Sequence, residues 1–329
     1  MGNEEKGYAT SMQLWPAELE AMRPEARAVV DAGMEFVSAL FGGDTPMPSD
    51  PIERAKVARQ AFSATYAPVP EAQVRNFNGV ECRVFVPEGK AEAVYVHFHG
   101  GGMVIGAPEM SDGANLDLAK RFNVAVVSVN YRKAPEYPFP AGPDDGIAVM
   151  QWLLENSQSE FGADTFFLGG ESAGGYMAAA VALRIRDDLK AIQKVRGLVL
   201  TYGVHDWGHS PSQRGDRITN AADMLDPEGM RFYADCYLPT MSTEERRAPH
   251  VSPLFASLEN LPPSFLSVGS ADHLLDDTLM LAPRLAAAGN DVELFVAPEM
   301  PHGFQAFPCA ITTAWQQSLD SWLTRQLRK

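Results

Sequence analysis

Apolar residues recur along this chain with two periods, one of about 3.6 residues and one of two, which predict helices and strands respectively. The helical period is clear in residues 16–41 and again in residues 51–64, where Pro51 suits a first helical turn. Asn78-Gly79 lies between two strand-like segments and is the strongest short signal for a β-hairpin. The chain is therefore expected to begin with two helices and a hairpin.

From residue 94 onward, strand-like and helix-like segments alternate. Several of the strand-like segments are apolar throughout, as expected for strands that are covered on both faces. Including the hairpin, the predicted strands cover residues 74–77, 80–86, 94–98, 124–129, 165–168, 198–202, 265–268 and 292–296. The helices predicted for this part lie near residues 112–122, 143–156, 173–187, 276–288 and 310–327. This order predicts an α/β fold, with a mostly parallel sheet of about eight strands flanked by helices.

The alternation breaks once. About sixty residues without a strand separate the segment that ends near residue 202 from the one that starts near residue 264, which is longer than an ordinary connection. Apolar residues such as Met224 recur in this stretch and indicate short helices, although an irregular surface excursion is the alternative. We predict a helical cap and a main α/β domain, the cap formed by residues 1–50 and 204–250 and the main domain by residues 51–203 and 251–329.

Composition narrows the class of protein. The chain has 329 residues, of which 46% are hydrophobic and 21% charged, and this is enough for a sizeable core. The formal net charge of −15 would repel phosphate backbones and anionic lipids, so nucleic acids and membrane surfaces are poor candidate partners. No apolar run approaches the length of a membrane span, and the acidic N-terminus does not resemble a signal peptide. We expect a soluble, cytoplasmic protein that acts on small neutral molecules.

The sequence offers no clear metal site. Its three cysteines lie far apart and match neither a disulfide framework nor the spacing of metal ligands. His205 and His209 have the spacing of the zinc motif H-E-x-x-H, but Gly208 and the Ser-Pro pair that follows argue against the helix on which that motif depends. We expect neither a metal nor another cofactor.

A glycine-rich turn carries the first chemical signal. Gly170 and Gly174 bracket Ser172 in the pattern G-x-S-x-G, between a predicted strand and a predicted helix. Glycines allow a turn so sharp that a Cβ on either flank would clash, and the turn exposes the serine hydroxyl at the positive end of the helix. This geometry is typical of a serine nucleophile. A glycine-rich helix start with Ser172 as its N-cap is the alternative.

A second glycine run, His99-Gly100-Gly101-Gly102, follows the predicted strand at 94–98. Three glycines let backbone N–H groups point into a cleft, where they can bind a developing oxyanion. In hydrolases with a G-x-S-x-G turn, such a loop acts together with the N–H group of the residue after the serine, which here is Ala173. A flexible turn is the alternative. His99 itself is expected to brace the loop.

A serine nucleophile needs a base and an acid that orients the base, expected in the chain order Ser, Asp or Glu, His. Asp272 and His302 each lie just past a predicted strand, at the edge that forms the ligand crevice of open α/β sheets. There His302 would take the proton of Ser172, and Asp272 would hold the imidazole in the right tautomer. Asp276 and Asp277 compete for the role of acid, but they open the next helix, where we attribute them to capping.

Several groups of residues, in this order along the chain, resemble the hormone-sensitive-lipase-like family of α/β-hydrolase carboxylesterases, the bacterial family IV type. They are His99-Gly100-Gly101-Gly102, Tyr131-Arg132-Lys133-Ala134-Pro135-Glu136 with Phe139-Pro140-Ala141 and Asp144-Asp145, Gly170-Glu171-Ser172-Ala173-Gly174-Gly175, Asp272, and His302-Gly303-Phe304. The resemblance covers residues from about 94 to 305. One departure is visible at Asp272-His273-Leu274, where the family commonly has Asp-Pro-Leu.

The resemblance implies a cofactor-free serine carboxylesterase with a helical cap, which favours short- or medium-chain esters. Its implied triad is Ser172, Asp272 and His302, and its implied oxyanion donors are Gly101, Gly102 and Ala173, with His99 and Gly100 as loop support. Candidates for the wall of the acyl pocket are Met103, Trp207, Met224, Phe232 and Tyr233. Residues 131–145 are expected to brace the oxyanion loop.

Some points stay open at the level of sequence. The same triad could serve an amidase or another acyl hydrolase, and a small-molecule receptor on an inactive hydrolase fold is a further alternative. An edge strand near residues 292–296 could pair across a homodimer. Glu171, next to the serine, has no assigned role.

Overall fold

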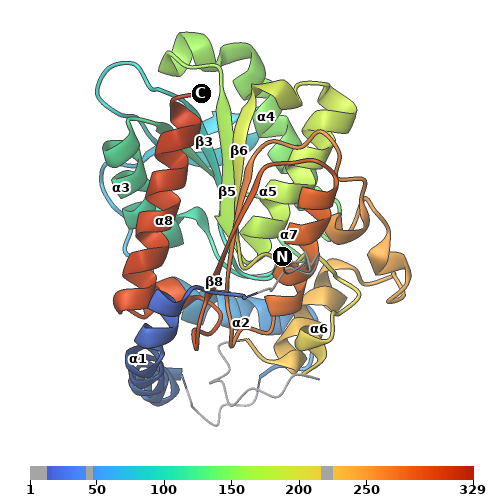
Figure 1. Ribbon diagram of the computed structural model, residues 1–329. Helices are drawn as coiled ribbons and strands as arrows, with labels where there is room; N and C mark the ends of the chain where they lie inside the picture. The colour runs from blue at the N-terminus through green and yellow to red at the C-terminus, as the bar shows by residue number, and fades with distance from the viewer. Residues whose placement is uncertain (1–12, 42–46, 216–224) are drawn as a thin grey trace, which may run out of the picture.

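The computed structural model describes residues 13–41, 47–215 and 225–329. Its centre is one eight-stranded sheet in the order β1-β2-β4-β3-β5-β6-β7-β8 (Figure 1). The first three strands of this order pair antiparallel, and every later pair is parallel. The strands are β1 (Gln73–Phe77), β2 (Val80–Phe85), β3 (Val94–Phe98), β4 (Ala125–Val129), β5 (Phe166–Glu171), β6 (Val195–Thr201), β7 (Ser264–Gly269) and β8 (Val292–Ala297). The α/β fold and the mostly parallel sheet expected from the sequence are confirmed.

The hairpin that opens the sheet has the predicted turn. Asn78 and Gly79 both adopt positive φ angles, +50° and +91°. Two such residues form the turn whose twist matches that of the flanking strands, so β1 pairs with β2 over the full length of β1.

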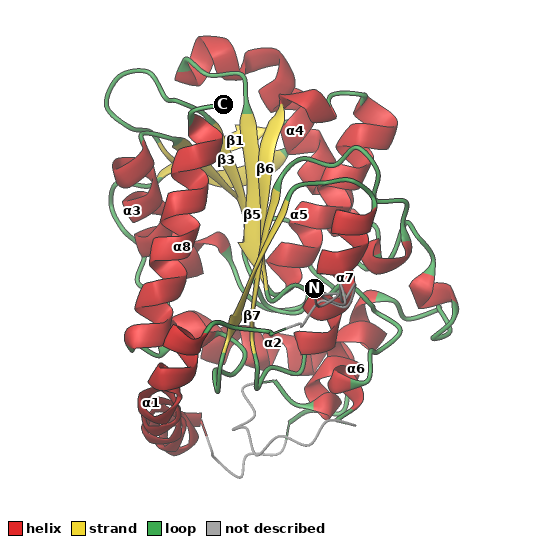
Figure 2. Ribbon diagram, in the orientation of Figure 1, coloured by secondary structure: helices red, strands yellow, loops and turns green. Residues whose placement is uncertain are grey.

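Helices cover both faces of the sheet (Figure 2). On one face lie α3 (Asp112–Phe122) and α8 (Ala310–Leu327), and on the other α4 (Ala141–Phe161), α5 (Ala173–Arg184) and α7 (Leu275–Ala287). Side chains of a strand therefore enter two separate cores in turn. In β3, Val96 belongs to the core under α4 and α5, and its neighbour Tyr95 belongs to the core under α8.

Three further helices lie beyond the carboxyl ends of the parallel strands, the end toward which β5 points (Figure 1). They are α1 (Ala17–Phe41), α2 (Pro51–Ser63) and α6 (Pro227–Tyr237). Asp50 and Asp226 cap α2 and α6 through hydrogen bonds to backbone N–H groups of the first turn, and a proline follows each cap. No helix in the described part of the chain is long and apolar enough to cross a membrane.

The boundaries differ from the expected ones mainly where a helix is longer than its apolar pattern. Helix α4 spans Ala141–Phe161 rather than residues 143–156. The segment expected as one helix over residues 173–187 is α5 followed by a wider π-helical turn, Ile185–Leu189. Strand β6 begins at Val195, three residues earlier than expected.

Candidate active site

The turn around Ser172 joins β5 to α5 and has the sharpness that its glycines indicate. Ser172 adopts φ 57° and ψ −119°, a backbone conformation that residues other than glycine rarely adopt. A Cβ on Gly170 or on Gly174 would run into the carbonyl oxygen of Phe98 at the end of β3. The glycines therefore let the turn lie directly against the neighbouring strand. Ser172 occupies the N-cap position of α5, but its side chain makes no capping hydrogen bond there.

Ser172, His302 and Asp272 lie in hydrogen-bond contact, in that order. His302 Nε2 is 3.0 Å from Ser172 Oγ, and His302 Nδ1 is 2.9 Å from Asp272 Oδ2. Because a carboxylate only accepts, Nδ1 carries the proton and Nε2 is free to accept the serine proton. Asp272 is 2% exposed, and its other oxygen accepts from the Leu274 N–H group at 2.8 Å. The three residues come from the ends of β5, β7 and β8.

The loops that carry Asp272 and His302 are joined by hydrogen bonds. The N–H groups of Ser270 and Ala271 donate to the carbonyls of Ala297 and Met300, at 2.8 and 3.0 Å. A Cβ on Gly269 would meet the Met300 carbonyl, so this close approach requires glycine. These contacts fix the distance between the acid and the base before any ligand is present.

Helix α1 supports the loop that carries His302. Arg23 donates from Nε to Glu299 Oε1 at 2.9 Å, and the Glu299 N–H group donates to Ser270 Oγ at 2.9 Å. The His302 ring also packs edge-on against Tyr202, with the ring centroids 4.7 Å apart. Side chains from α1 and from the residue that follows β6 thus hold the loop.

The glycine loop after β3 passes beside Ser172. Gly101 and Gly102 have φ angles of +119° and +59°, and a Cβ on Gly102 would meet the ring of Tyr233 in α6. Within the described part of the chain, the N–H groups of Gly101, Gly102 and Ala173 have no protein acceptor. Three unpaired donors near one serine hydroxyl form the arrangement that an oxyanion requires.

His99 braces this loop, as expected. Its Nδ1 donates to the Gly100 carbonyl at 2.7 Å, and its ring stacks on Tyr131 with the centroids 4.3 Å apart. Tyr131 in turn donates from its hydroxyl to the His99 carbonyl at 2.8 Å. Complete burial holds the pKa of His99 well below its usual range, so the imidazole is neutral and cannot serve as a second cation at the site.

The residues after Tyr131 make structural contacts. The Arg132 N–H group and guanidinium bind the carboxylate of Asp145 at 2.7 to 3.0 Å. Arg59 of α2 donates to the Val104 and Ala134 carbonyls, each at 2.7 Å. These bonds tie the start of α4 to the segment that follows β4, and α2 both to that segment and to Val104 after the glycine loop.

A family model described as "alpha/beta hydrolase fold" matches residues 95–306, a segment that contains all three residues of the hydrogen-bonded series. The chain belongs to the α/β-hydrolase family. Within this α/β-hydrolase family it falls in the hormone-sensitive-lipase-like branch, as the sequence motifs indicate.

Relatives of this α/β-hydrolase include two proteins of Mycobacterium tuberculosis. "Esterase LipI" is 31% identical over 230 residues, which cover 69% of this chain and 70% of the relative. "Carboxylesterase NlhH" is 33% identical over 231 residues, which cover 67% of this chain and 69% of the relative.

Two solved structures share the fold of this chain. An esterase of Pyrobaculum calidifontis is 26% identical with a TM-score of 0.74, and the match covers 84% of this chain and 98% of the other. A hormone-sensitive lipase from a metagenome library is 27% identical with a TM-score of 0.75, over 93% of this chain and 98% of the other.

Beside Ser172 this α/β-hydrolase has a cavity of about 470 Å³. Its wall combines the three glycines of the loop, Ser172, Glu171 and His302 with apolar side chains that include residues of α2 and α6. The apolar part is formed by Phe62, Ile105, Met110, Tyr202, Val204, Trp207, Leu225, Met230, Tyr233 and Leu274. Among the described lining residues Glu171 is the one carboxylate, and no Lys or Arg is present. The cavity suits an uncharged, mostly apolar group.

The expected pocket residues fall into three groups. Trp207 and Tyr233 line the cavity, and Met224 lies outside the described residues. Met103 and Phe232 do not line it, which corrects the expectation. Met103 is 1% exposed because its side chain fills the space left by a missing Cβ at Gly142.

Phe232 makes a different contact. The Arg54 guanidinium of α2 lies 4.2 Å from its ring centroid, where a cation–π interaction joins α2 to α6. Phe62, Leu225 and Met230 were not anticipated as wall residues. Phe62 lies on the apolar face of a predicted helix, but nothing in its spacing indicated that the helix borders a cavity.

Asp277 has a role other than helix capping. Its buried carboxylate accepts hydrogen bonds from the N–H groups of His205 and Asp206 at 2.7 and 2.8 Å, from Ser210 Oγ at 2.7 Å and from Gln213 Nε2 at 2.8 Å. These hydrogen bonds hold residues 205–213, which include Trp207, against α7. Asp276 likewise accepts from the Ser212 N–H group. The capping explanation was wrong for both residues, although neither contacts His302.

Proposed function

We propose that this α/β-hydrolase is a serine carboxylesterase that hydrolyses neutral esters with short- to medium-chain acyl groups, and that Ser172 is its nucleophile. The observation that carries the proposal is the series Ser172–His302–Asp272, at 3.0 and 2.9 Å, beside three unpaired N–H groups. The printed names of the relatives, esterase and carboxylesterase, support the same chemistry.

In the first half of the reaction, His302 Nε2 takes the proton of Ser172 while Oγ attacks the ester carbonyl. The carbonyl oxygen becomes negative in the tetrahedral intermediate, and the N–H groups of Gly101, Gly102 and Ala173 bind it. His302 then returns the proton to the leaving alkoxide as the carbon–oxygen bond breaks. The alcohol departs, and the acyl group remains on Ser172.

In the second half, His302 takes a proton from water, which attacks the acyl carbonyl. The same N–H groups bind the second tetrahedral intermediate. His302 then protonates Ser172 Oγ, and the carboxylic acid leaves. Asp272 keeps the imidazole in one tautomer and stabilises its cationic form in both halves.

The cavity supports the proposed substrate class. A volume of about 470 Å³ holds a small ester but not a long lipid chain, and its apolar wall favours an uncharged acyl group. Rates with p-nitrophenyl esters from acetate to laurate are therefore expected to peak at short or medium chain length.

Replacing the nucleophile tests the proposal. Ser172→Ala is expected to lower kcat for p-nitrophenyl butyrate by at least about 10⁴-fold with unchanged far-UV circular dichroism. Ser111→Ala is the matched control, because Ser111 lines the same cavity without a neighbouring base, and it should retain activity and labelling by a fluorophosphonate. Turnover or labelling that persists in Ser172→Ala would refute the assignment. Paired butyrate esters and amides test whether esters are preferred.

We also propose that α2 and α6 form the cap together, which would move the domain boundary past residue 50. Phe62 of α2 and Tyr233 of α6 both line the cavity, and Arg54 of α2 contacts α6 through Phe232. No described residue of α1 lines the cavity, and α1 packs on α8 instead. The division into cap and catalytic domain otherwise stays as predicted from sequence.

A homodimer and a cytoplasmic location remain proposals. Strand β8 is an edge of the sheet, and Leu294 on it is 40% exposed, which supports pairing between two copies. Leu294→Lys should then give a monomer in light scattering, while Val74→Lys on the opposite edge strand should not. Cys82, Cys236 and Cys309 are free thiols, which supports a reducing compartment.

A further inference from the structure

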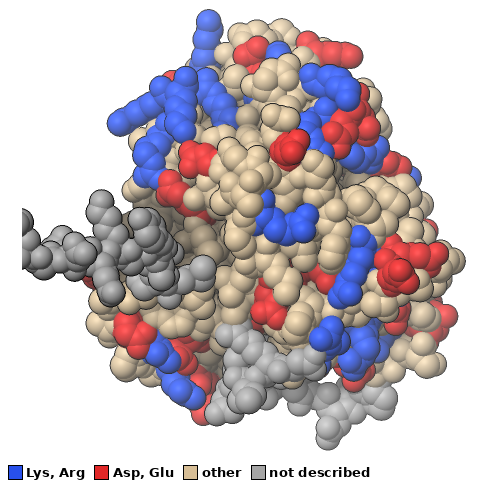
Figure 3. All heavy atoms as spheres, turned by 45° about the vertical axis from the view of Figure 1, so that its right-hand side comes forward, with Lys and Arg blue, Asp and Glu red and all other residues tan. Residues whose placement is uncertain are grey.

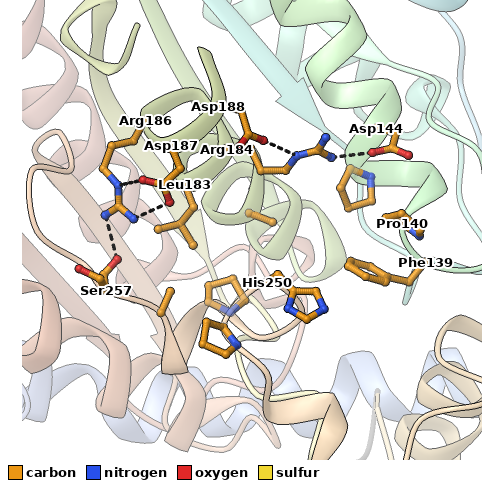
Figure 4. Close-up of a pocket in the computed structure, with 15 residues that line it drawn as sticks. Phe139, Pro140, Asp144, Leu183, Arg184, Arg186, Asp187, Asp188, His250 and Ser257 are labelled. Atoms are coloured by element: carbon orange, nitrogen blue, oxygen red, sulfur yellow. Dashed lines mark hydrogen bonds and ion pairs between the residues drawn. The ribbon is translucent and has the colours of Figure 1, made fainter. Parts of the chain in front are cut away.

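A second cavity lies apart from the one beside Ser172, and the two share no lining residue. It has a volume of about 570 Å³ and lies between the first turn of α4, the end of α5 and residues 249–257 (Figure 4). Phe139, Leu183, Pro253 and further proline and alanine side chains form its apolar floor, next to the ring of His250.

Charged side chains form the rim of this second cavity, and the carboxylates are more exposed than the guanidiniums. The side chains of Asp144, Asp187 and Asp188 are 46%, 57% and 57% exposed, whereas those of Arg184 and Arg186 are 34% and 14% exposed. Figure 4 shows both arginines engaged by neighbouring oxygens. The rim therefore presents more accessible negative than positive charge.

The guanidinium donors are largely used within the protein. Arg186 binds both oxygens of Asp187 and the carbonyls of Ser257 and Glu259, at 2.7 to 2.8 Å. Arg184 donates to Asp144 at 2.7 Å and to Asp188 at 3.3 Å. An anionic ligand would have to displace these bonds, whereas a cation can use carboxylate lone pairs that face solvent.

We propose that this second cavity binds a small amphiphilic amine, with its apolar body on the floor and its ammonium group at the acidic rim. Three carboxylates and two engaged guanidiniums line the cavity, so its lining residues carry one more negative than positive charge. The protein carries a formal net charge of −15, which adds a long-range attraction for cations. On the face shown in Figure 3, acidic and basic side chains are interspersed.

The floor of the second cavity is connected through aromatic contacts to the wall of the cavity beside Ser172. The Phe139 N–H group donates to the Tyr237 carbonyl at 3.0 Å, and the two rings meet edge to face at 5.7 Å. Tyr237 in turn packs on Trp207, with centroids 4.9 Å apart, and Trp207 lines the cavity beside Ser172. A bound amine would therefore rest on the same aromatic layer as the acyl group of the substrate.

Isothermal titration calorimetry with 4-phenylbutylammonium tests the site without using the enzyme activity. The amine is expected to bind at least about fivefold more tightly than 4-phenylbutan-1-ol or 4-phenylbutanoate, and less tightly as salt is raised. Asp188→Asn should weaken binding two- to fivefold, the usual range for one exposed charge interaction. Asp164→Asn is the matched control, since Asp164 pairs with Lys194 outside the cavity, and it should leave binding unchanged.

A second variant fills the cavity rather than changing its charge. Ser257 is exposed at the rim, and Arg186 binds only its carbonyl, so Ser257→Trp should block the cavity and abolish binding without loss of the fold. The proposal is overturned if the alcohol or the anion binds as tightly as the amine, or if Asp188→Asn and Ser257→Trp both bind like wild type. The latter result would place the amine elsewhere. None of these outcomes depends on Ser172 being the nucleophile.

Discussion

His97 Nε2 donates to Glu171 Oε2 at 3.1 Å, and this bond ties a buried residue of β3 to the carboxylate in the catalytic cavity. Because the carboxylate only accepts, Nε2 carries the proton, and on the other side of the ring Nδ1 lies 2.9 Å from Ser128 Oγ and 3.3 Å from Asn115 Nδ2. Glu171 is thus held beside Ser172 by a histidine that solvent does not reach. Glu171, to which no role could be assigned from the sequence, therefore has a fixed position beside Ser172.

Glu171→Gln tests whether this carboxylate selects substrates by charge. The amide can keep the contact with His97, so the main change is the loss of one negative charge from a mostly apolar cavity. We expect kcat/KM for an ester with a cationic acyl group to fall about three- to tenfold, and that for an anionic ester to rise by a similar factor. Rates for neutral p-nitrophenyl butyrate should change less than twofold.

The exposed Glu88→Gln is the charge-matched control for this comparison and should leave all three ratios as in wild type. Equal effects of Glu171→Gln on cationic, neutral and anionic esters would mean that Glu171 acts on structure alone.

Gly101→Ala should impair the oxyanion loop. The φ angle of +119° is unfavourable for alanine, and the added Cβ would meet the Ile105 carbonyl, so the loop has to shift. Loss of one aligned donor typically lowers kcat by about 10²- to 10³-fold. We expect a loss of this size in steady-state kinetics with little change in KM.

Gly113→Ala provides the same substitution where space is free, since no atom lies within 4 Å of a Cβ there, and it should not lower activity. Full activity in Gly101→Ala would exclude the loop as the oxyanion site.

Asp272→Asn and Asp277→Asn separate the acid of the proposed triad from the acid that binds residues 205–213. Asp272→Asn should lower kcat by about 10⁴-fold, because the amide favours the wrong tautomer of His302. Asp277→Asn should leave at least about a tenth of the activity but lower the melting temperature, since four donors converge on that carboxylate. If Asp277→Asn lowered kcat more than Asp272→Asn did, and Asp272→Asn lowered the melting temperature more, the two roles would be the reverse of those assigned.

The stability conferred by Asp277 should depend on pH. Burial raises the pKa of this carboxyl from 3.8 to about 7 in the folded protein, against the lowering effect of its hydrogen bonds. Between about pH 4 and pH 7 the folded state therefore binds a proton that the unfolded state does not. This contribution is complete below pH 4 and is lost as the pH rises through 7.

Urea unfolding of wild type and Asp277→Asn at pH 8, 7, 6 and 5 measures this effect. The free energy of unfolding of wild type, minus that of the variant, should increase as the pH falls, by at most about 1.4 kcal/mol per unit below pH 7. A difference that decreases toward pH 5 would contradict the raised pKa.

The sheet and the group formed by Ser172, Asp272 and His302 could be predicted because local patterns determine them. Strand ends, the glycine turns and the polar residues just after β7 and β8 follow from spacing along the chain. The edge where parallel strands end then brings Ser172, Asp272 and His302 together without knowledge of distant contacts.

The cavity wall and the role of Asp277 could not be predicted in this way. Whether Phe62 or Phe232 faces the cavity depends on how α2 and α6 cross, which is decided by tertiary contacts such as Arg54 on the Phe232 ring. Asp277 looks like a capping residue in sequence, but its hydrogen-bond donors lie more than sixty residues away. Polar networks between distant segments leave little trace in local spacing.

The ring of Tyr233 leaves no room for a Cβ on Gly102, so one part of the cavity wall and the loop beneath it form a single packed unit. For redesign of the substrate range, the wall then divides into two kinds of position. Phe62 and Leu225 are partly buried and can be exchanged with effects mainly on fit, whereas a change at Tyr233 also alters the support of the glycine loop. Combinatorial libraries that keep Tyr233 should therefore yield variants with new selectivity and preserved turnover.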